Sequence, residues 1–242
     1  MQNKWYWIFK NIIFGPFLRV YNRPEIVGVD NIPSAGPAII ASNHQSVMDS
    51  FFLPLLCPRQ ITFLAKAEYF NGTTLVGRLQ KWFFTSSGSR PVNRTSASAG
   101  QDAMNTAVEV LNDGDLFGIY PEGTRSPDGR LYKGKTGVAR IALASGAQVI
   151  PVAMIGTGDV NPIGTWFPRP GKVRVKVGDP IYPIEFVNNR GLERDSYEAI
   201  RALTDHIMHQ LQQLSGQEYA DVYAAEVKKA LAEGGDSSPH NP

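Results

Sequence analysis

A histidine and an aspartate stand five residues apart in the segment Ser42–Asp49, directly after the apolar run that begins at Pro37. At this spacing, a turn and the first helical turn can bring the Asp49 carboxylate to one ring nitrogen of His44 and leave the other nitrogen exposed. Such a contact fixes the imidazole tautomer and stabilises the protonated ring, as a general base requires. The same spacing also occurs in ordinary structural hydrogen bonds, so the pair predicts catalysis only in the company of further polar residues.

A second polar cluster follows another apolar run, at positions 120–126, and its candidate site residues are Glu122, Gly123, Thr124 and Arg125. Gly123 allows a ligand to approach the backbone closely. The guanidinium of Arg125 offers a planar, bidentate set of donors that suits phosphate. This cluster therefore favours the binding of a phosphate-bearing ligand.

Two further cations lie between these clusters in the sequence. A turn-rich segment, Gly88–Arg94, ends in a guanidinium, and Lys66 closes an earlier apolar run. Together with Arg125, these side chains would form a phosphate site beside the general base. Either arginine taken singly has the alternative interpretation of a surface ion-pair residue.

The elements that must position these residues alternate short β-like runs with helical patterns. The candidate strands are 37–42, 60–65, 115–120, 148–155 and 172–177, and the candidate helices are 97–112 and 137–144, the latter ending at Gly146. This alternation predicts an α/β fold, a single domain over 25–190 with a central mixed β-sheet flanked by helices. Both polar clusters follow strands, where α/β proteins commonly bind ligands.

Beyond Gly191 the pattern becomes helical. One apolar face is formed by side chains three or four residues apart, namely Tyr197, Ile200, Leu203, Ile207, Leu211 and Leu214. Asp195 or Ser196 would cap this helix. A second helix is predicted from Gln217 to Ala232, so that 191–232 forms a pair of C-terminal helices, and the tail 233–242 is predicted to be disordered.

The first 24 residues are dense in aromatic side chains and are flanked by Lys4, Arg19 and Arg23. Lys10 and the Gly15–Pro16 pair interrupt the apolar run well short of the roughly 20 residues that a spanning helix needs. We therefore expect a helical segment that lies in the membrane interface, where Trp and Tyr are favoured. This predicts a peripheral or monotopic membrane protein on the cytoplasmic face. The alternative is a helix packed on the protein's own core.

The charge distribution and the cysteine content limit the kinds of ligand and metal site that the protein can have. The formal net charge is only +2, yet six Lys and Arg residues stand against one acid, Glu68, between positions 59 and 94. Such a local basic stretch suits a phosphorylated ligand or an anionic membrane surface better than nucleic acid. The single cysteine, Cys57, excludes an intramolecular disulfide and a cysteine-built zinc site, and its apolar neighbours predict a buried structural thiol. No metal is implied, and the sequence makes no prediction of oligomeric state.

Four segments in order resemble the motifs of the glycerolipid acyltransferase family, and the similarity is closest to its 1-acyl-glycerol-3-phosphate acyltransferases. The segments are Asn43–Asp49 with its N-H-x-x-x-x-D pattern, 88–94, Pro121–Arg125 and Val149–Ala153. The resemblance implies that His44 is the base and Asp49 its partner. It also implies that Arg94, Glu122 and Arg125 bind the acceptor or position the site, and that Lys66 binds phosphate.

The resemblance further implies a reaction. His44 would take the proton of an acceptor hydroxyl as its oxygen attacks a thioester carbonyl, with backbone amides near Gly123 as candidate donors to the oxyanion. The co-substrate would be acyl-CoA or acyl-carrier protein, with no cofactor, and the acceptor would be 1-acyl-glycerol-3-phosphate (lysophosphatidic acid). Glycerol-3-phosphate and other lysophospholipids are the alternative acceptors.

Three other classes of protein compete with this interpretation. Residues Gly129–Thr136 match the phosphate-loop pattern G-x-x-x-x-G-K-[ST], but the strand that should precede such a loop ends near Tyr120. A hydrolase is a second alternative, although the sequence contains no G-x-S-x-G motif. A non-catalytic lipid-binding protein is the third, and it would not require His44.

Overall fold

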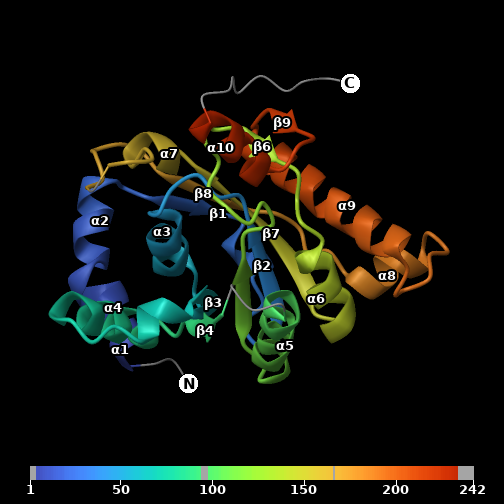
Figure 1. Ribbon diagram of the computed structural model, residues 1–242, viewed down its shortest axis with the longest axis horizontal. Helices are drawn as coiled ribbons and strands as arrows, with labels where there is room; N and C mark the ends of the chain where they lie inside the picture. Colours follow the sequence, from blue (N-terminus) through green and yellow to red (C-terminus); the bar gives the residue numbers. More distant parts are fainter. Residues whose placement is uncertain (1–3, 94–97, 166, 234–242) are drawn as a thin grey trace.

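The computed structural model describes residues 4–93, 98–165 and 167–233, and it is built around one large β-sheet (Figure 1). The sheet has seven strands in the order β1-β8-β7-β2-β5-β3-β4. In chain order the strands are β1 (Glu25–Val27), β2 (Ala38–Ser42), β3 (Ile61–Lys66), β4 (Arg90–Val92), β5 (Leu116–Ile119), β7 (Gln148–Ile155) and β8 (Arg174–Val177). Strands β7 and β8 pair antiparallel and all other neighbours pair parallel, so the predicted mixed sheet is confirmed.

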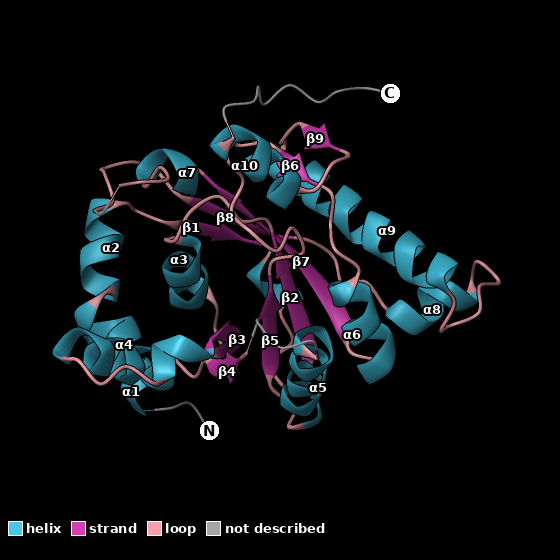
Figure 2. Ribbon diagram, viewed as in Figure 1, coloured by secondary structure: helices cyan, strands magenta, loops and turns pink. Residues whose placement is uncertain are grey.

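Helices cover both faces of this sheet (Figure 2). The α-helices are α1 (Lys4–Ile8), α2 (Gly15–Tyr21), α3 (Asp49–Leu56), α4 (Leu75–Ser86), α5 (Ala99–Asn112), α6 (Gly137–Ser145), α7 (Thr157–Val160), α8 (Pro183–Asn188), α9 (Tyr197–Ser215) and α10 (Ala224–Ala232). A π-helix, η1 (Phe9–Ile13), joins α1 to α2, and two short 3-10 helices are η2 (Val29–Asn31) and η3 (Ala67–Phe70). Helices α5, α6, α8 and α9 lie on one side of the sheet, and α2 and α3 lie on the other.

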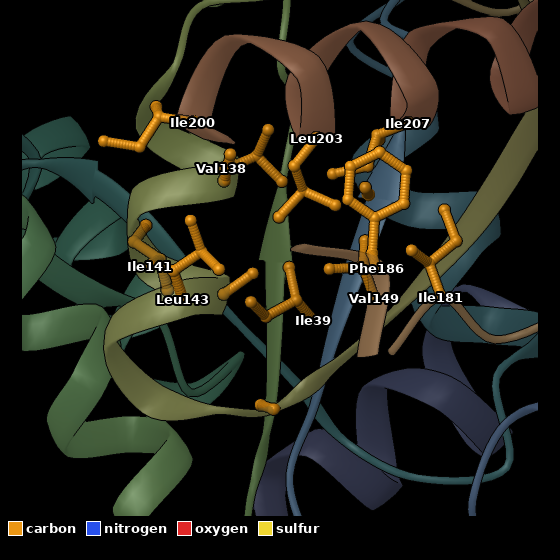
Figure 3. Close-up of a cluster of buried hydrophobic side chains, with 14 of the residues drawn as sticks. Ile39, Val138, Ile141, Leu143, Val149, Ile181, Phe186, Ile200, Leu203 and Ile207 are labelled. Carbon is orange, nitrogen blue, oxygen red and sulfur yellow. The ribbon is translucent and has the colours of Figure 1, made fainter. Parts of the chain in front are cut away.

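The central strand β2 is buried along its whole length. Because side chains alternate along a strand, Ile39 faces α6 and α9 while Ile40 faces α3. Figure 3 shows Ile39 with Val138 of α6 and Leu203 of α9 in the first of these two cores. Burying each such side chain contributes about 1.5–3 kcal/mol, so both layers hold the sheet firmly.

The long helix α9 follows the predicted apolar face. Ser196 caps it, since its Oγ accepts a hydrogen bond from the Ala199 N–H at 3.1 Å. Leu203, Ile207 and Leu211 are fully buried. Tyr197 is the exception: it stands in the first helical turn with 69% of its surface exposed, beyond the reach of the core.

The predicted helix from Gln217 to Ala232 is wrong over its first half. Gly216 ends α9 with a left-handed backbone, φ 73°. The next residues pair with the chain after the second polar cluster, forming a two-stranded parallel sheet from β6 (Leu131–Tyr132) and β9 (Tyr219–Ala220). These backbone groups bond to another strand instead of to their own helix, so α10 begins only at Ala224. Apart from Glu233, the predicted disordered tail lies outside the described residues.

The N-terminal segment is helical and has two different faces. Tyr6, Phe9 and Leu18 are buried, and the Tyr6 hydroxyl donates to the Pro54 carbonyl of α3 at 3.1 Å. Trp7 and Ile12 are more than half exposed. The segment therefore packs on the protein's own core while presenting apolar side chains outward. Within the described ranges, no helix has both the length and the apolar character needed to cross a membrane.

Cys57 is fully buried at the end of α3, as predicted for a structural thiol. Burial raises the pKa of its thiol. The Lys10 ammonium donates a hydrogen bond to the Cys57 carbonyl oxygen. This contact links the N-terminal segment to the loop that enters β3.

Candidate active site

Three neighbouring parallel strands deliver the predicted site residues to one edge of the sheet. Strand β2 leads to His44, β5 leads to Glu122, and β3 ends at Lys66. Ala41 of β2 pairs with Ile119 of β5, so the chain segments three residues beyond each partner stay side by side. The His44 N–H accordingly donates to the Glu122 carboxylate at 2.9 Å. The register of the sheet thus joins two clusters that are 78 residues apart.

His44 and Asp49 are in direct contact. The distance from His44 Nδ1 to Asp49 Oδ2 is 2.9 Å, and the same carboxylate oxygen accepts the N–H groups of Gln45 and Ser46, each at 2.8 Å. Asp49 is fully buried at the first position of α3, where the positive end of the helix dipole favours a carboxylate. The His44 side chain keeps 17% of its surface exposed. Because Nδ1 is occupied, Nε2 is the nitrogen left to meet a ligand.

Tyr120 is a site residue that the sequence did not reveal. Its ring stacks on the His44 imidazole, with 3.9 Å between centroids and 11° between planes. Its hydroxyl lies 3.2 Å from Ser50 Oγ, and burial raises the pKa of this phenol. The imidazole is therefore held at its edge by Asp49 and across its face by Tyr120. The only sequence signal was an aromatic residue directly before Pro121.

Glu122 connects the two clusters from inside the protein. Its second carboxylate oxygen accepts the Tyr132 N–H of β6 at 3.0 Å, and the side chain is 1% exposed. Burial raises its pKa to about 7, although the backbone hydrogen bonds from Tyr132 and His44 act in the opposite direction. Both oxygens are engaged by backbone amides, so the contacts favour positioning of the site by Glu122 over direct phosphate binding.

Asn43 is a second residue for which the sequence predicted no role, although it belongs to the motif. Its amide exchanges two hydrogen bonds with the backbone of Met154, at 2.7 Å and 3.0 Å, and so extends the pairing of β2 with β7 by one side chain. It also donates to Gln217 Oε1 at 2.6 Å. This buried amide fixes the backbone immediately before His44.

The predicted cations fall into two groups. Lys66 and Arg125 line the same cleft as His44, together with Lys135, which the prediction did not include. Gly123 has φ 74°, a left-handed backbone conformation that favours glycine, and a Cβ atom there would lie 3.1–3.2 Å from the flexible end of the Lys135 side chain. Thr124 Oγ1 accepts a hydrogen bond from Lys228 at 2.7 Å. Arg94 lies outside the described residues.

The Gly123 N–H is not available as an oxyanion donor. It donates to the Tyr120 carbonyl at 2.9 Å and so closes the turn between β5 and the second polar cluster. The nearby Ser126 N–H is also engaged, because it donates to the His44 carbonyl at 2.7 Å. The turn therefore uses these two donors, and an oxyanion donor among the other backbone amides near Gly123 stays a prediction.

The cleft has a volume of about 1100 Å³, and both apolar and charged side chains line it. The lining comes from the N-terminal segment, from α3, from strands of the sheet and from α5 and α6. The apolar lining residues include Tyr6, Phe9, Phe14, Leu18, Phe51, Leu55, Ile61, Phe63, Tyr69, Phe84, Met104, Val138 and Ile141, and the polar ones include Lys10, His44, Lys66, Tyr120, Thr124, Arg125, Lys135 and Arg140. Such a lining can hold a ligand that combines an elongated apolar chain with an anionic group.

The phosphate-loop interpretation of Gly129–Thr136 is contradicted by the local structure. Strand β6 occupies the middle of the pattern, where a phosphate loop would wrap its ligand. Lys133 forms an ion pair with Asp221 at 2.9 Å, and Gly134 packs against Met208 of α9. The sequence matches the phosphate-loop pattern, but the strand lies within the matching residues instead of before them. Across the described part of the chain, no three His, Cys, Asp or Glu side chains are grouped so as to hold a metal ion.

The fold and site define a member of the acyltransferase family. The sequence profile of the family described as "Acyltransferase" matches residues 23–155, more than half of the chain, and the chain therefore belongs to this family. The matched region includes both polar clusters and ends at the last residue of β7. Helices α9 and α10 lie beyond it.

Two of the similar proteins carry the same enzyme name. A chloroplastic 1-acyl-sn-glycerol-3-phosphate acyltransferase of Arabidopsis thaliana is 32% identical over 177 residues, which are 72% of this chain and 47% of the plant protein. The chain thus spans about half the length of that relative. A 1-acyl-sn-glycerol-3-phosphate acyltransferase of Bacillus subtilis is 27% identical over 81% of this chain and 87% of its own length.

A solved structure supports the fold as well. The crystal structure of the 1-acyl-sn-glycerophosphate acyltransferase PlsC from Thermotoga maritima superposes with a TM-score of 0.62 at 27% identity. The match covers 83% of this chain and 76% of that protein. The predicted α/β architecture is therefore shared with a known lysophosphatidic acid acyltransferase.

Proposed function

We propose that this protein transfers a fatty acyl group from an acyl thioester to the free hydroxyl of 1-acyl-glycerol-3-phosphate, which gives phosphatidic acid. The donor would be acyl-CoA or acyl-carrier protein. The names of the relatives support the acceptor, and the geometry of the cleft supports the chemistry. Glycerol-3-phosphate and other lysophospholipids remain the alternative acceptors.

One observation carries the proposal. His44 is oriented by Asp49 at 2.9 Å and lines a cleft whose walls carry both cationic and apolar side chains. A lysophosphatidic acid molecule combines the matching groups, with a phosphate at one end, a long acyl chain at the other and the reactive hydroxyl between them. A base in the wall of such a cleft is therefore suited to act on that hydroxyl.

In this mechanism, His44 carries one proton from the acceptor hydroxyl to the leaving thiolate. His44 Nε2 accepts the hydroxyl proton while the oxygen attacks the thioester carbonyl carbon, and the carbonyl π electrons move to its oxygen. Collapse of the tetrahedral intermediate breaks the C–S bond. The imidazolium then returns the proton to the leaving thiolate. The buried Asp49 carboxylate stabilises the imidazolium between these steps.

Positive charge lies close to this reaction. A Cβ atom at Gly123 would be 3.2 Å from Lys135 Nζ, so this ammonium lies over the turn that follows Tyr120. Arg125 and Lys66 line the same cleft. In a partly desolvated cleft, these cations would bind the acceptor phosphate more strongly than they would in bulk water.

Replacing His44 tests the proposal. The His44→Ala variant should lose about 10²–10⁴-fold in kcat for acyl transfer to 1-acyl-glycerol-3-phosphate, because the base contributes about that factor. His209→Ala is the matched control, since His209 is an exposed histidine on α9. Product should be identified by mass, with both acyl donors and each alternative acceptor assayed. Near-normal turnover by a folded His44→Ala protein would favour the non-catalytic lipid-binding alternative and refute the mechanism.

The membrane-facing part of the proposal rests on the outer face of the N-terminal segment. Trp5 is 47% exposed and Trp7 is 51% exposed, and Trp5 contacts Trp82 of α4 at 5.4 Å between ring centroids. Tryptophan favours the interface between lipid and water. The same segment lines the cleft with the apolar side chains of Tyr6, Phe9 and Leu18. We infer peripheral binding to the cytoplasmic face of a membrane, with this segment in contact with lipid.

A further inference from the structure

The C-terminal helix α10 is anchored beside the second polar cluster. Strand β9 pairs with β6, and the buried residues Tyr132, Ala220 and Ala224 form a small core of their own under the start of α10. Figure 1 shows α10 adjoining β6 and β9. This packing extends the site with an element that lies outside the residues matched by the family profile.

Helix α10 delivers one lysine to the cluster. Lys228 Nζ donates to Thr124 Oγ1 at 2.7 Å, across 104 residues of sequence. Burial and the neighbouring Arg125 guanidinium lower the pKa of Lys228, while Glu122 raises it. An ammonium has three N–H donors, so two remain after the bond to Thr124.

This lysine and its cationic neighbours form no ion pair among the described residues, although the buried Glu122 carboxylate is near enough to raise the Lys228 pKa. The ion pairs within 4.0 Å in the described part of the chain include none made by Arg125, Lys135 or Lys228. The adjacent Lys229 differs, because it is exposed and lies 3.9 Å from Glu233. Lys228 bonds to Thr124, which lines the cleft, and it repels the neighbouring Arg125 guanidinium. An anion bound between the two cations would relieve that repulsion.

We propose that Lys228 binds the acceptor phosphate together with Arg125 and thereby sets the preference for phosphate-bearing acceptors. The proposal rests on the proposed function. Lys228 supplies a point charge at the Thr124 wall, and Arg125 supplies the planar donor set. The ammonium acts on the part of the acceptor that does not react, so its contribution is to acceptor binding and not to the proton transfer at His44.

The experiment compares three single variants of the full chain. Lys228→Gln removes the charge but can still donate to Thr124, Lys228→Arg keeps the charge, and Lys229→Gln is the matched control on the next residue. Steady-state kinetics should be measured with 1-acyl-glycerol-3-phosphate and with the 1-acylglycerol that carries the same chain but no phosphate. The donor concentration should be varied separately, and a melting temperature should be recorded for each protein.

Lys228→Gln should raise KM for the phosphate-bearing acceptor by about 10–100-fold, as expected for losing a charge-assisted hydrogen bond. The kcat and the KM for the donor should change little, and turnover of the 1-acylglycerol should not fall. Lys228→Arg should recover much of the loss, and Lys229→Gln should behave as wild type. Inorganic phosphate should raise the melting temperature of the wild-type protein, and it should raise that of Lys228→Gln by less.

Equal KM values for Lys228→Gln and Lys229→Gln would overturn the proposal. A uniform loss with both acceptors would also overturn it, because that result indicates a structural role. Should Lys228→Gln fold poorly, Lys228→Met and the phosphate melting shift decide the question. A wild-type protein that acylates neither acceptor refutes the proposed function, whereas the melting shift tests the anion site independently of turnover.

Discussion

At the scale of single residues, the imidazole of His44 is restrained in two directions. Asp49 fixes its edge, and the Tyr120 ring lies parallel to its face at 3.9 Å between centroids. A general base must reach its proton with the correct distance and direction, and small misplacements reduce rates strongly. The stacking contact should therefore affect turnover although it carries no proton.

Two variants of Tyr120 separate its ring from its hydroxyl. Tyr120→Ala should lower kcat by about 10²-fold because the imidazole loses the support of its face. Tyr120→Phe keeps the stack and loses only the contact with Ser50, so its kcat should stay close to wild type. Equal losses in both variants would show that the hydroxyl, and not the stack, is what the reaction requires.

Glu122 should make the stability of the protein depend on pH. Its folded-state pKa is raised from 4.5 to about 7, so the folded state binds its proton more tightly than the unfolded state does. This contribution to stability is present below about pH 4.5 and is lost as pH rises through about 7, at a cost of about 3 kcal/mol. Urea unfolding at about pH 5 and about pH 8 should show the decline in wild type and a smaller decline in Glu122→Gln.

The control for this comparison is Glu109→Gln, which removes an exposed acid from α5. This variant should reproduce the wild-type pH dependence. If Glu122→Gln keeps the full wild-type decline, the buried carboxylate is not its source.

At the scale of elements, the N-terminal segment combines an inner and an outer role. Tyr6 and Leu18 are buried against the domain, so removing the whole segment would open the core as well as the proposed lipid contact. Substitutions on its outer face are therefore the sharper test of membrane binding. Trp7 and Ile12 are exposed by 51% and 58%.

The double variant Trp7→Ser and Ile12→Ser should bind lipid vesicles at least about tenfold more weakly, because interfacial binding scales with the apolar area inserted. Its melting temperature should be close to that of wild type. Vesicles of mixed neutral and anionic lipid, followed by sedimentation, provide the measurement. Val27→Ser, which removes an exposed apolar residue outside the segment, should sediment as wild type does. Unchanged sedimentation of the double variant would contradict the interfacial role.

Elements with strong patterns could be predicted from the sequence, and elements without them could not. The face of α9 repeats over many turns, so its helix and its buried leucines followed from spacing. The residue types before it left Asp195 and Ser196 open as the cap, and the structure shows Ser196. Strand β9 has only two residues, which is too short for any period to show. Its existence depends on β6: Leu131 of β6 pairs with Tyr219 of β9, 88 residues later in the sequence.

At the scale of the whole molecule, the contacts of the site also divide into those that the sequence could predict and those that only the fold establishes. His44 and Asp49 are close in sequence, and local geometry predicted their contact. Asn43 meets Met154 and Lys228 meets Thr124 across more than 100 residues, and these partners are set by the fold. Arg125 could be predicted as a cation of the site. For Glu122 the sequence left acceptor binding and positioning of the site open, and the two backbone amides that its carboxylate holds favour positioning.

The bond between Asn43 and Met154 also orders events during synthesis. The loop that carries His44 leaves the ribosome early, but it has no partner at its Asn43 end until β7 has been made, 111 residues later. Contacts of such long span form late and slow folding. A nascent chain that already contains His44, Asp49 and Arg125 therefore holds every letter of both polar clusters before it can hold the base in place. The nascent protein should become competent for chemistry only after β7 has been made.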